Sequence, residues 1–468
     1  MTTRETLSLV PGVGLAPAAG GLRQVTGRDN LVLPSVSAGV EAALEALSEG
    51  GRTLGELTER AGRNGLTDAA MFHRLLERLR VQELLARTLQ LEGVTISRLA
   101  PAAPQARGPA PREGVRYGLS RFAFTHLVDG ALVLEMPLSE GRLWLSTWHG
   151  PALLGALITP KRPEDFATAV PGIPVDAAAA FLRMLAEAGA LTEIGAGGSP
   201  VEAEVLATWE FHDLLFHRQT RWGKREGGVY GGATFRFRGH LPEPGKKPPF
   251  PGEVFPLAVP DLAEVERKDP PFTTVLERRR SIREYGSQPI TRAELGELLY
   301  RAVGLRHVVF PGRGEGEARP YPSGGALYET QVYVLVHRCE GLEAGLYHYR
   351  VDDHALYRVS GHTPDLELLL KSAMANAILN APPQVMLILT ACFARVAWKY
   401  ETMAYAVMLK HVGVILQTLY LVATAMGLAP CGLGAGSAEV FARASGLDPI
   451  VEGSVGEFML GTPPEAGG

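Results

Sequence analysis

A run of prolines between residues 240 and 260 limits, more than any other feature, how this chain of 468 residues can fold. The segment reads HLPEPGKKPPFPGEVFPLAVP. Proline lacks a backbone N–H and fixes φ, so this stretch cannot continue a helix or a central strand. We therefore expect an extended arm that separates an N-terminal part from a final folded part, with about two to four domains in all.

The composition is that of an ordinary globular protein. Hydrophobic residues make up 46% and charged residues 21%, and the net charge of −4 does not suggest a nucleic-acid-binding chain. The three cysteines, Cys339, Cys392 and Cys431, have neither disulfide nor metal-ligand spacing. The N-terminus does not resemble a signal peptide, and no uninterrupted run of about 18 apolar residues exists. We therefore expect a cytoplasmic protein without a metal site or a membrane span.

The N-terminal part is expected to begin with a tail, residues 1–35, and to continue as a winged-helix domain over residues 36–105. Apolar residues at helical spacing predict three short helices, and the sequence TLGE at residues 53–56 has the pattern of a capping box that opens the second. Two alternating stretches, residues 84–91 and 94–99, surround a Glu-Gly turn like the hairpin of a wing.

Residues 112–200 are expected to form a second winged-helix-like domain. Residues 122–127 and 131–136 flank Val128-Asp129-Gly130, which predicts a hairpin, and helical stretches follow. Residues 201–270 are expected to hold an apolar helix and then the proline-rich arm. The two smaller connecting elements are a Pro/Ala-rich linker at residues 100–111 and the apolar helix at residues 209–220.

Residues 271–468 alternate helices and strands, which predicts an α+β domain with a central mixed sheet. A helix at residues 292–303 is opened by a Thr291/Glu294 capping box. A long helix at residues 400–426 is apolar on nearly all sides, so we expect it to be buried or to lie at a subunit interface. The other predicted elements are a helix at residues 272–280 and strands at residues 331–337, 384–391 and 455–460.

The first candidate site lies where the final domain begins, in the sequence RRRSIR at residues 278–283. Several guanidiniums and one hydroxyl at a helix end suit a phosphate group, because the arginine fork matches phosphate oxygens. The alternative is a solvated basic turn.

Three further motifs follow. The stretch PYPSGGALY at residues 320–328 places two glycines where backbone can approach a planar ligand, although ordinary loops have the same composition. The stretch PCGLGAG at residues 430–436 follows the long helix and offers backbone N–H groups to a ring edge. Trp398-Lys399-Tyr400 opens that helix with an amine and a phenol suited to acid–base chemistry, the alternative being an exposed lysine beside a core tyrosine.

Taken in order, RRRSIREY, PYPSGGALYE, GLYHY, WKYETMAYAVMLKHVG and GLAPCGLGAG resemble the nitroreductase superfamily. More narrowly, they are similar to the SagB/ThcOx-type azoline dehydrogenases of thiazole- and oxazole-peptide biosynthesis. The resemblance covers residues 271–468 and extends more loosely upstream, over WEFHDLLFHRQTRWG and YGGATFRFRG. Each motif alone is unspecific, whereas five in this order are specific.

The resemblance implies a homodimeric, FMN-binding fold with the flavin at the dimer interface. It also implies a role for each matching position. The residues so implied are Arg279, Arg280, Ser281 and Arg283 at the ribityl phosphate, Pro322, Ser323, Gly324 and Gly325 beside the isoalloxazine and contributed by the other subunit, Gly432, Leu433 and Gly434 near the ring's N5 side, and Lys399 and Tyr400 as the catalytic pair.

The implied reaction is the FMN-dependent oxidation of peptide thiazolines or oxazolines to thiazoles or oxazoles. A base takes the α-proton while the flavin accepts a hydride from the β-carbon. The base is either Lys399 or Tyr400, and in the second case Lys399 stabilises the phenolate. The implied partners are an azoline-containing precursor peptide whose leader adds a strand to the wing sheet, a cyclodehydratase and a second copy of the chain.

Two other functions fit the same residues. One is an NAD(P)H-dependent nitro- or quinone reductase, because the superfamily supports both chemistries. The other is a flavin-sensing, DNA-binding protein whose third helix offers Arg74 and Arg78 to phosphates. That helix also carries acidic residues such as Glu77, so its charge is mixed.

Overall fold

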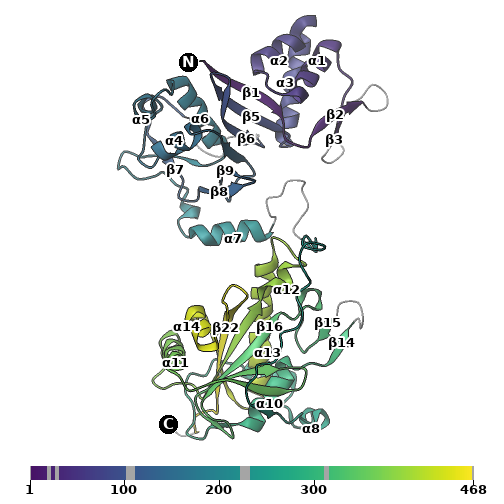
Figure 1. Ribbon diagram of the computed structural model, residues 1–468, viewed down its shortest axis with the longest axis vertical. Coiled ribbons are helices and arrows are strands. Elements are labelled where there is room, and N and C mark those ends of the chain that lie inside the picture. Colours follow the sequence, from purple (N-terminus) through teal and green to yellow (C-terminus); the bar gives the residue numbers. More distant parts are fainter. Residues whose placement is uncertain are drawn as a thin grey trace. The chain divides into compact units, whose positions relative to one another are not determined.

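This computed structural model describes residues 2–17, 23–26, 31–101, 111–221, 232–309 and 316–465. The chain divides into two compact units, Met1–Tyr230 and Gly231–Gly468 (Figure 1). Most of the predicted linker at residues 100–111, and the first residues of the upstream motif YGGATFRFRG, lie outside the described residues.

The first unit begins its helical part as predicted. The Thr53 hydroxyl accepts a hydrogen bond from the Glu56 N–H at 3.2 Å, and the Glu56 carboxylate accepts one from the Thr53 N–H at 2.9 Å, which completes the capping box. Phe72 is fully buried beneath the helices. The predicted three helices and hairpin are α1 (Ala38–Glu49), α2 (Leu54–Ala61), α3 (Leu66–Val81), β5 (Leu85–Leu91) and β6 (Val94–Ala100).

One antiparallel sheet runs through the whole first unit in the order β1-β5-β6-β10-β9-β8. The predicted tail at residues 1–35 is wrong, because β1 pairs with β5 over its full length; the strand was missed because TRETLSL holds few apolar residues. Nor are residues 36–105 and 112–200 separate domains, because β6 pairs with β10. The four further strands are β1 (Thr3–Leu9), β8 (Phe124–Val128), β9 (Ala131–Glu135) and β10 (Arg142–Leu145).

The predicted hairpin of β8 and β9 is present. Asp129 and Gly130 both have positive φ, of 49° and 79°, the conformation that a tight two-residue hairpin turn needs. The rest of the unit packs smaller elements around the sheet. They are β2 (Gly14–Pro17), β3 (Arg23–Thr26), β4 (Val32–Leu33), η2 (Gly62–Asn64), β7 (Tyr117–Leu119), α4 (His149–Ala156), η3 (Pro163–Asp165), α5 (Phe166–Ala169), α6 (Val175–Glu187), β11 (Leu191–Glu193), η4 (Glu204–Leu206) and α7 (Phe211–Arg221).

The second unit is built on a seven-stranded sheet in which every neighbouring pair is antiparallel. The prediction of a mixed sheet is therefore wrong; hairpins such as β18–β19 replace the parallel crossovers that alternating helices and strands suggested. The proline-rich arm is also less irregular than predicted, because β12 joins the sheet at its edge, where proline is tolerated. In spatial order the strands are β12 (Val254–Pro256), β19 (Ala355–Gly361), β18 (Gly345–Arg350), β16 (Thr330–Val336), β20 (Val385–Cys392), β22 (Glu452–Gly461) and β21 (Ala429–Leu433).

Helices cover both faces of this sheet (Figure 1). Val332 and Val334 of β16 pack with α10 and α13, whereas Tyr333 and Leu335 pack with α11 and α14, because successive side chains of a strand point to opposite faces. The remaining elements are α8 (Leu262–Lys268), α9 (Phe272–Arg278), β13 (Ile290–Thr291), α10 (Arg292–Val303), β14 (His307–Val309), β15 (Gly316–Ala318), β17 (Cys339–Glu340), α11 (Pro364–Ala377), α12 (Phe393–Ala397), α13 (Ala404–Ala425) and α14 (Ala438–Ser445).

Helix α13 crosses the core of the second unit. By length and composition it could span a membrane, with a mean hydropathy of 1.6, although Lys410, His411 and Gln417 interrupt its apolar sequence. Val412, Ile415 and Leu419 pack into the unit's core, and 39% of the helix's most apolar 18-residue window is buried. The apolar character is therefore explained in part by packing within this chain.

Candidate active site

The arginine-rich segment begins where α9 ends, at Arg278, and continues without regular secondary structure. Among the residues that the structure describes, no carboxylate forms an ion pair with Arg279, Arg280 or Arg283. The Arg279 guanidinium instead lies 5.3 Å from the centre of the Tyr420 ring. A cluster of guanidiniums without counter-ions is an anion site by its charge and its donors.

Tyr420 of α13 joins this segment to the glycine-rich stretch at residues 430–436. Its hydroxyl lies 2.7 Å from the Ser281 hydroxyl and accepts the Gly432 N–H, also at 2.7 Å. The Ile282 N–H donates to the Pro430 carbonyl at 2.8 Å. Two motifs that are about 150 residues apart in the sequence therefore lie side by side. Sequence reasoning missed Tyr420, because a tyrosine within an apolar helix carries no local signal of this contact.

The paired glycines lie in the short turn η5 (Gly324–Ala326). Gly325 has φ +67°, and a Cβ there would come within 2.3 Å of Lys399 Nζ and 3.0 Å of Tyr400 Oη. The structure thus brings the predicted glycines and the predicted Lys–Tyr pair together within one chain. Ser323 supports the turn by accepting the Tyr328 N–H at 3.0 Å.

A buried histidine holds this turn in place. The Gly324 N–H donates to His411 Nε2 at 2.7 Å, so His411 carries its proton on Nδ1, which lies 2.8 Å from a Glu329 carboxylate oxygen. Glu329 is fully buried. Sequence analysis assigned no role to His411, because nothing in its neighbours along α13 indicates the contact with residue 324.

Lys399 and Tyr400 lie in the turn between α12 and α13, not at the start of the long helix as predicted, since α13 begins at Ala404. The N–H groups of both residues donate to the Val396 carbonyl, at 3.1 and 2.8 Å, and hold the turn. We call residues 398–400 the Lys–Tyr turn. Ala233, from the segment before the proline-rich arm, forms a β-bridge with Tyr400.

The Lys399 ammonium has unusual surroundings for a half-buried cation. Among the described residues it pairs with no carboxylate; it lies beside Gly325 and 5.5 and 5.9 Å from the ring centres of Tyr400 and Phe235. A cation that is partly removed from water usually has a counter-ion. An amine without one, next to a phenol, is suited to exchange a proton with a bound molecule.

The glycine-rich loop after β21 closes a cavity of about 220 Å³. Leu433 and Gly434, both predicted to lie near a flavin, line it together with apolar residues of α13. The Glu457 carboxyl also lines it; burial raises the pKa of this group, and the Ser454 hydroxyl donates to it at 2.5 Å. Sequence reasoning missed Glu457, although a charged residue inside the apolar strand VGEFMLG was a visible signal.

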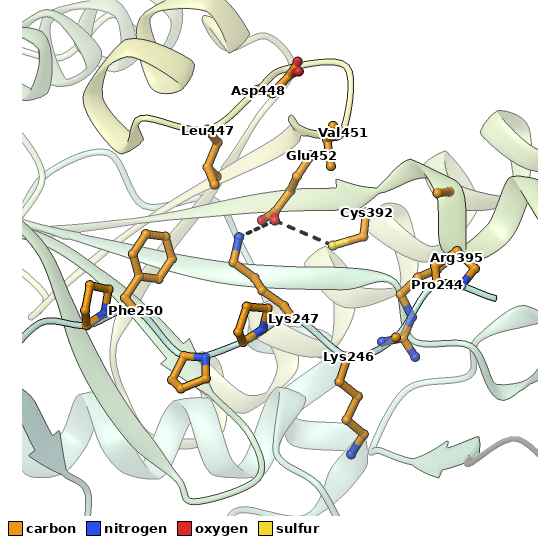
Figure 2. Close-up of a pocket in the computed structure, with 15 residues that line it drawn as sticks. Pro244, Lys246, Lys247, Phe250, Cys392, Arg395, Leu447, Asp448, Val451 and Glu452 are labelled. Carbon is orange, nitrogen blue, oxygen red and sulfur yellow. Dashed lines mark hydrogen bonds and ion pairs between the residues drawn. The ribbon is translucent and has the colours of Figure 1, made fainter. Parts of the chain in front are cut away.

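Another cavity, of about 510 Å³, lies between the proline-rich arm and the start of α12 (Figure 2). At its floor the Lys247 ammonium pairs with the Glu452 carboxylate, which also accepts the Tyr333 hydroxyl at 2.9 Å. Burial raises the pKa of the nearby Cys392 thiol to about 12, so this thiol stays protonated. The Lys247, Glu452 and Cys392 side chains therefore interact with one another within a lining that also contains several prolines.

The residues of this unit fit FMN. The uncompensated guanidiniums suit a phosphate, and the open backbone at Gly434, with nothing within 4 Å of its Cβ position, allows close approach of a flat ring. Helix α13 links the two regions, because His411 and Tyr420 are nine positions apart, about 13 Å of helix rise. In one chain the arginine segment and the glycine turn beside the Lys–Tyr turn therefore lie near different parts of α13.

Comparisons with known proteins give two family matches along this chain. Residues 276–462 match the nitroreductase family and residues 117–226 match the cyanobactin oxidase ThcOx family. A nitroreductase-like protein of Methanocaldococcus jannaschii is 32% identical over 184 residues, which are 39% of this chain and 86% of that protein.

Two further relatives are processing proteins. The trifolitoxin-processing protein TfxB of Rhizobium leguminosarum bv. trifolii is 28% identical over 35% of this chain and 44% of its own length. The microcin B17-processing protein McbC of Escherichia coli is 33% identical over 24% of this chain and 42% of its own length. The chain therefore spans less than half of each of these two relatives. With the ordered motifs and the family matches, they establish that this chain belongs to the nitroreductase family and is of its SagB/ThcOx type.

Proposed function

We propose that this protein oxidises thiazoline or oxazoline rings of a ribosomally made peptide to thiazoles or oxazoles, with FMN as its cofactor. The observation that carries the proposal is the Lys399 ammonium, which has no counter-ion among the described residues and lies against Gly325 and Tyr400. The names of the two processing relatives support a peptide-maturation role.

In this proposal the arginine segment holds the phosphate of FMN. Arg279, Arg280 and Arg283 supply the charge, and Ser281, fixed by Tyr420, supplies a hydroxyl. When bound, FMN supplies the two-electron acceptor for a hydride. The residues proposed to pass along its ring are Pro322, Ser323, Gly324 and Gly325 on one side and Gly432, Leu433 and Gly434 on the other.

The protein's own chemical task is to remove the α-proton of the azoline. Either the neutral amine of Lys399 or the phenolate of Tyr400 accepts that proton. Oxidation of one ring removes a proton and a hydride in total, and the electrons finally pass to dioxygen. Both groups lie beside Gly325, so Lys399 can stabilise a Tyr400 phenolate. This geometry therefore allows either residue to be the base.

Absorption spectroscopy and mass spectrometry test the proposal. The purified protein should be yellow, and its extracted pigment should be FMN. An azoline-containing peptide should lose two hydrogens per ring, and this loss should be abolished in Lys399→Ala and Tyr400→Phe while FMN stays bound. Unchanged azole formation in both variants would refute the role of the pair.

We also propose that the chain works as a homodimer through α13. Tyr405, Leu409 and Gly413 lie four positions apart on this helix and are exposed, so they form one open face of an apolar helix. Light scattering should give twice the mass of one chain, and Leu409→Arg should halve it. Mixing Arg280→Ala with Lys399→Ala protein restores activity only if each site draws its halves from two subunits.

The first unit is proposed to recognise the leader of the precursor peptide by strand addition. Both strands of the predicted wing, β5 and β6, are already flanked, so the edges at which a strand can be added are those of β1 and β8. The leader can add to only one of these edges, so either Thr3→Pro in β1 or Thr125→Pro in β8, and not both, should weaken binding of the leader-containing peptide. Equal affinity of the full chain for peptides with and without leader would contradict the proposal.

A cyclodehydratase that forms the azoline is the proposed enzymatic partner, because the substrate ring must be closed before it is oxidised. A plain nitro- or quinone reductase is the second candidate, favoured by the 32% identity to the archaeal nitroreductase-like protein. Stopped-flow measurement separates the two, since rapid reduction of bound FMN by NADPH supports the reductase and slow reduction supports the peptide enzyme.

A further inference from the structure

Residues 232–241 lie along the Lys–Tyr turn and form a wall beside it. The Phe235 N–H donates to the Lys399 carbonyl at 3.3 Å, and Trp398 Nε1 donates to the Leu241 carbonyl at 3.4 Å. Thr234 adds a hydrogen bond of 3.0 Å to the Glu401 carboxylate, just after the turn. The wall is therefore fixed to the turn at both of its ends.

Within this wall, Phe235 is the non-glycine residue with an unusual backbone conformation. Its φ is +50°, in the left-handed region that bulky side chains rarely adopt. A glycine or an asparagine would take the same conformation at lower free energy. Backbone strain of this kind is found at functional sites more often than elsewhere, so the ring of Phe235 calls for an explanation beyond folding.

Three side chains lie around the ring of Phe235. It meets the Trp398 ring edge-to-face at 5.7 Å, the Arg238 guanidinium lies 4.4 Å from its centre, and Lys399 Nζ lies 5.9 Å from it. It is only half-buried, so part of the ring remains open beside the amine. A fixed, partly open aromatic surface next to a proton-accepting group is a place for a flat ring to pack.

We infer that Phe235 is a specificity-determining residue, against whose ring the five-membered ring of the substrate packs, and that this wall favours thiazolines over oxazolines. The inference rests on the proposed function. Sulfur makes favourable contacts with aromatic rings that oxygen does not reproduce, and such a contact corresponds to a preference of about two- to tenfold. The aromatic wall also keeps water away from Lys399 without adding a carboxylate that would neutralise its charge.

The test uses the full-length protein and two peptides that differ only in a thiazoline or an oxazoline. Phe235→Ala removes the ring, and Phe235→Asn removes it while suiting the left-handed backbone, so one variant remains informative if the other misfolds. Phe237→Ala is the matched control, because Phe237 belongs to the same segment and carries the Arg236 guanidinium 4.5 Å from its ring centre.

The wild type should prefer the thiazoline peptide by about two- to tenfold in kcat/KM. Both Phe235 variants should raise KM for that peptide about tenfold, lower kcat little and reduce the preference towards one, with FMN affinity unchanged. Equal preference in the wild type, or equal KM in the Phe235 and Phe237 variants, overturns the inference and leaves the proposed function standing. Loss of FMN in Phe235→Asn also overturns it, because the ring would then serve the cofactor. A wild type that oxidises neither peptide overturns the proposed function as well.

Discussion

Two lysines of the second unit have nearly the same aromatic surroundings and opposite electrostatic ones. Lys247 Nζ lies 5.1 Å from the Phe250 ring and 5.5 Å from the Tyr333 ring. Lys399 Nζ lies 5.9 Å from the Phe235 ring and 5.5 Å from the Tyr400 ring. Lys247 pairs with the buried Glu452 carboxylate, whereas Lys399 pairs with no carboxylate among the described residues.

This difference is the reason for which we propose Lys247 as a structural cation and Lys399 as a reactive one. The Lys247 ammonium forms an ion pair with a buried carboxylate, so its expected role is structural. Lys399 lies against a glycine turn and pairs with no carboxylate among the described residues, so proton transfer to or from its amine would break no ion pair that the structure shows.

The largest expected effect is that of Lys399→Ala on the rate of azole formation. If this amine takes part in proton transfer, the rate of azole formation should fall about 10²- to 10⁴-fold, while FMN content and Tm stay at their wild-type values. Single-turnover kinetics with an azoline peptide measure the change. Lys371→Ala, an exposed lysine of α11, is the control and should keep the wild-type rate.

The next effect is on stability and concerns the other lysine. Glu452→Gln leaves Lys247 without its counter-ion, which should lower the free energy of unfolding of the second unit by about 3–5 kcal/mol. Urea denaturation measures it. Glu264→Gln breaks an exposed pair with Lys268 and should change stability by no more than about 0.5 kcal/mol, so equal effects of the two substitutions would contradict the distinction.

A third substitution gives Lys399 a nearby carboxylate, as Lys247 already has in Glu452. Phe235→Glu places a carboxylate beside the Lys–Tyr turn, and this charge favours the protonated forms of both the amine and the phenol. The pH at which azole formation reaches half of its maximal rate should therefore rise by about one to three pH units. Phe235→Gln has the same size without the charge, and superimposable pH–rate profiles of the two variants would show that the turn does not titrate in catalysis.

The smallest effect concerns Glu457. It lies on the same strand as Glu452 but pairs with no lysine among the described residues. Burial raises the pKa of Glu457 above its usual 4.5, so the folded state keeps a proton that the unfolded state releases. The free energy of unfolding contributed by this group is present below pH 4.5 and is lost as the pH rises through the raised value. Glu457→Gln does not titrate, so its stability relative to the wild type should increase over that range, by at most about 1.4 kcal/mol for each step of one in pH.

Denaturation curves at several pH values measure this difference. Glu439→Gln, in the first turn of α14, is the control, because this residue is exposed at a helix start. A constant difference between Glu457→Gln and the wild type across the range would mean that the cavity beside the glycine-rich loop does not hold a neutral carboxyl.

The sequence predicted well those elements that local signals define. The α10 helix has the predicted bounds and capping box, and the β8–β9 hairpin forms around its Asp-Gly turn, because both depend on residues within a few positions of one another. The motifs of the arginine segment, the paired glycines and the Lys–Tyr turn were identified by their order along the chain. Their local composition alone would not have sufficed.

The support of the site could not be predicted in this way. Tyr420 contacts Ser281 from 139 positions away, and His411 contacts Gly324 from 87 positions away, so no periodicity links them. The wall formed by Phe235 depends on a segment that sequence patterns leave irregular. The antiparallel sheet was mistaken for a mixed one because periodicity defines strands and leaves their pairing open.

The pairing of β6 with β10 has a practical consequence for anyone who wishes to reuse the first unit. Cutting the chain between these strands would leave a row of unsatisfied N–H and C=O groups on each fragment, and such edges aggregate. A transfer of this unit to another protein therefore has to keep the whole stretch from β1 to β10 together.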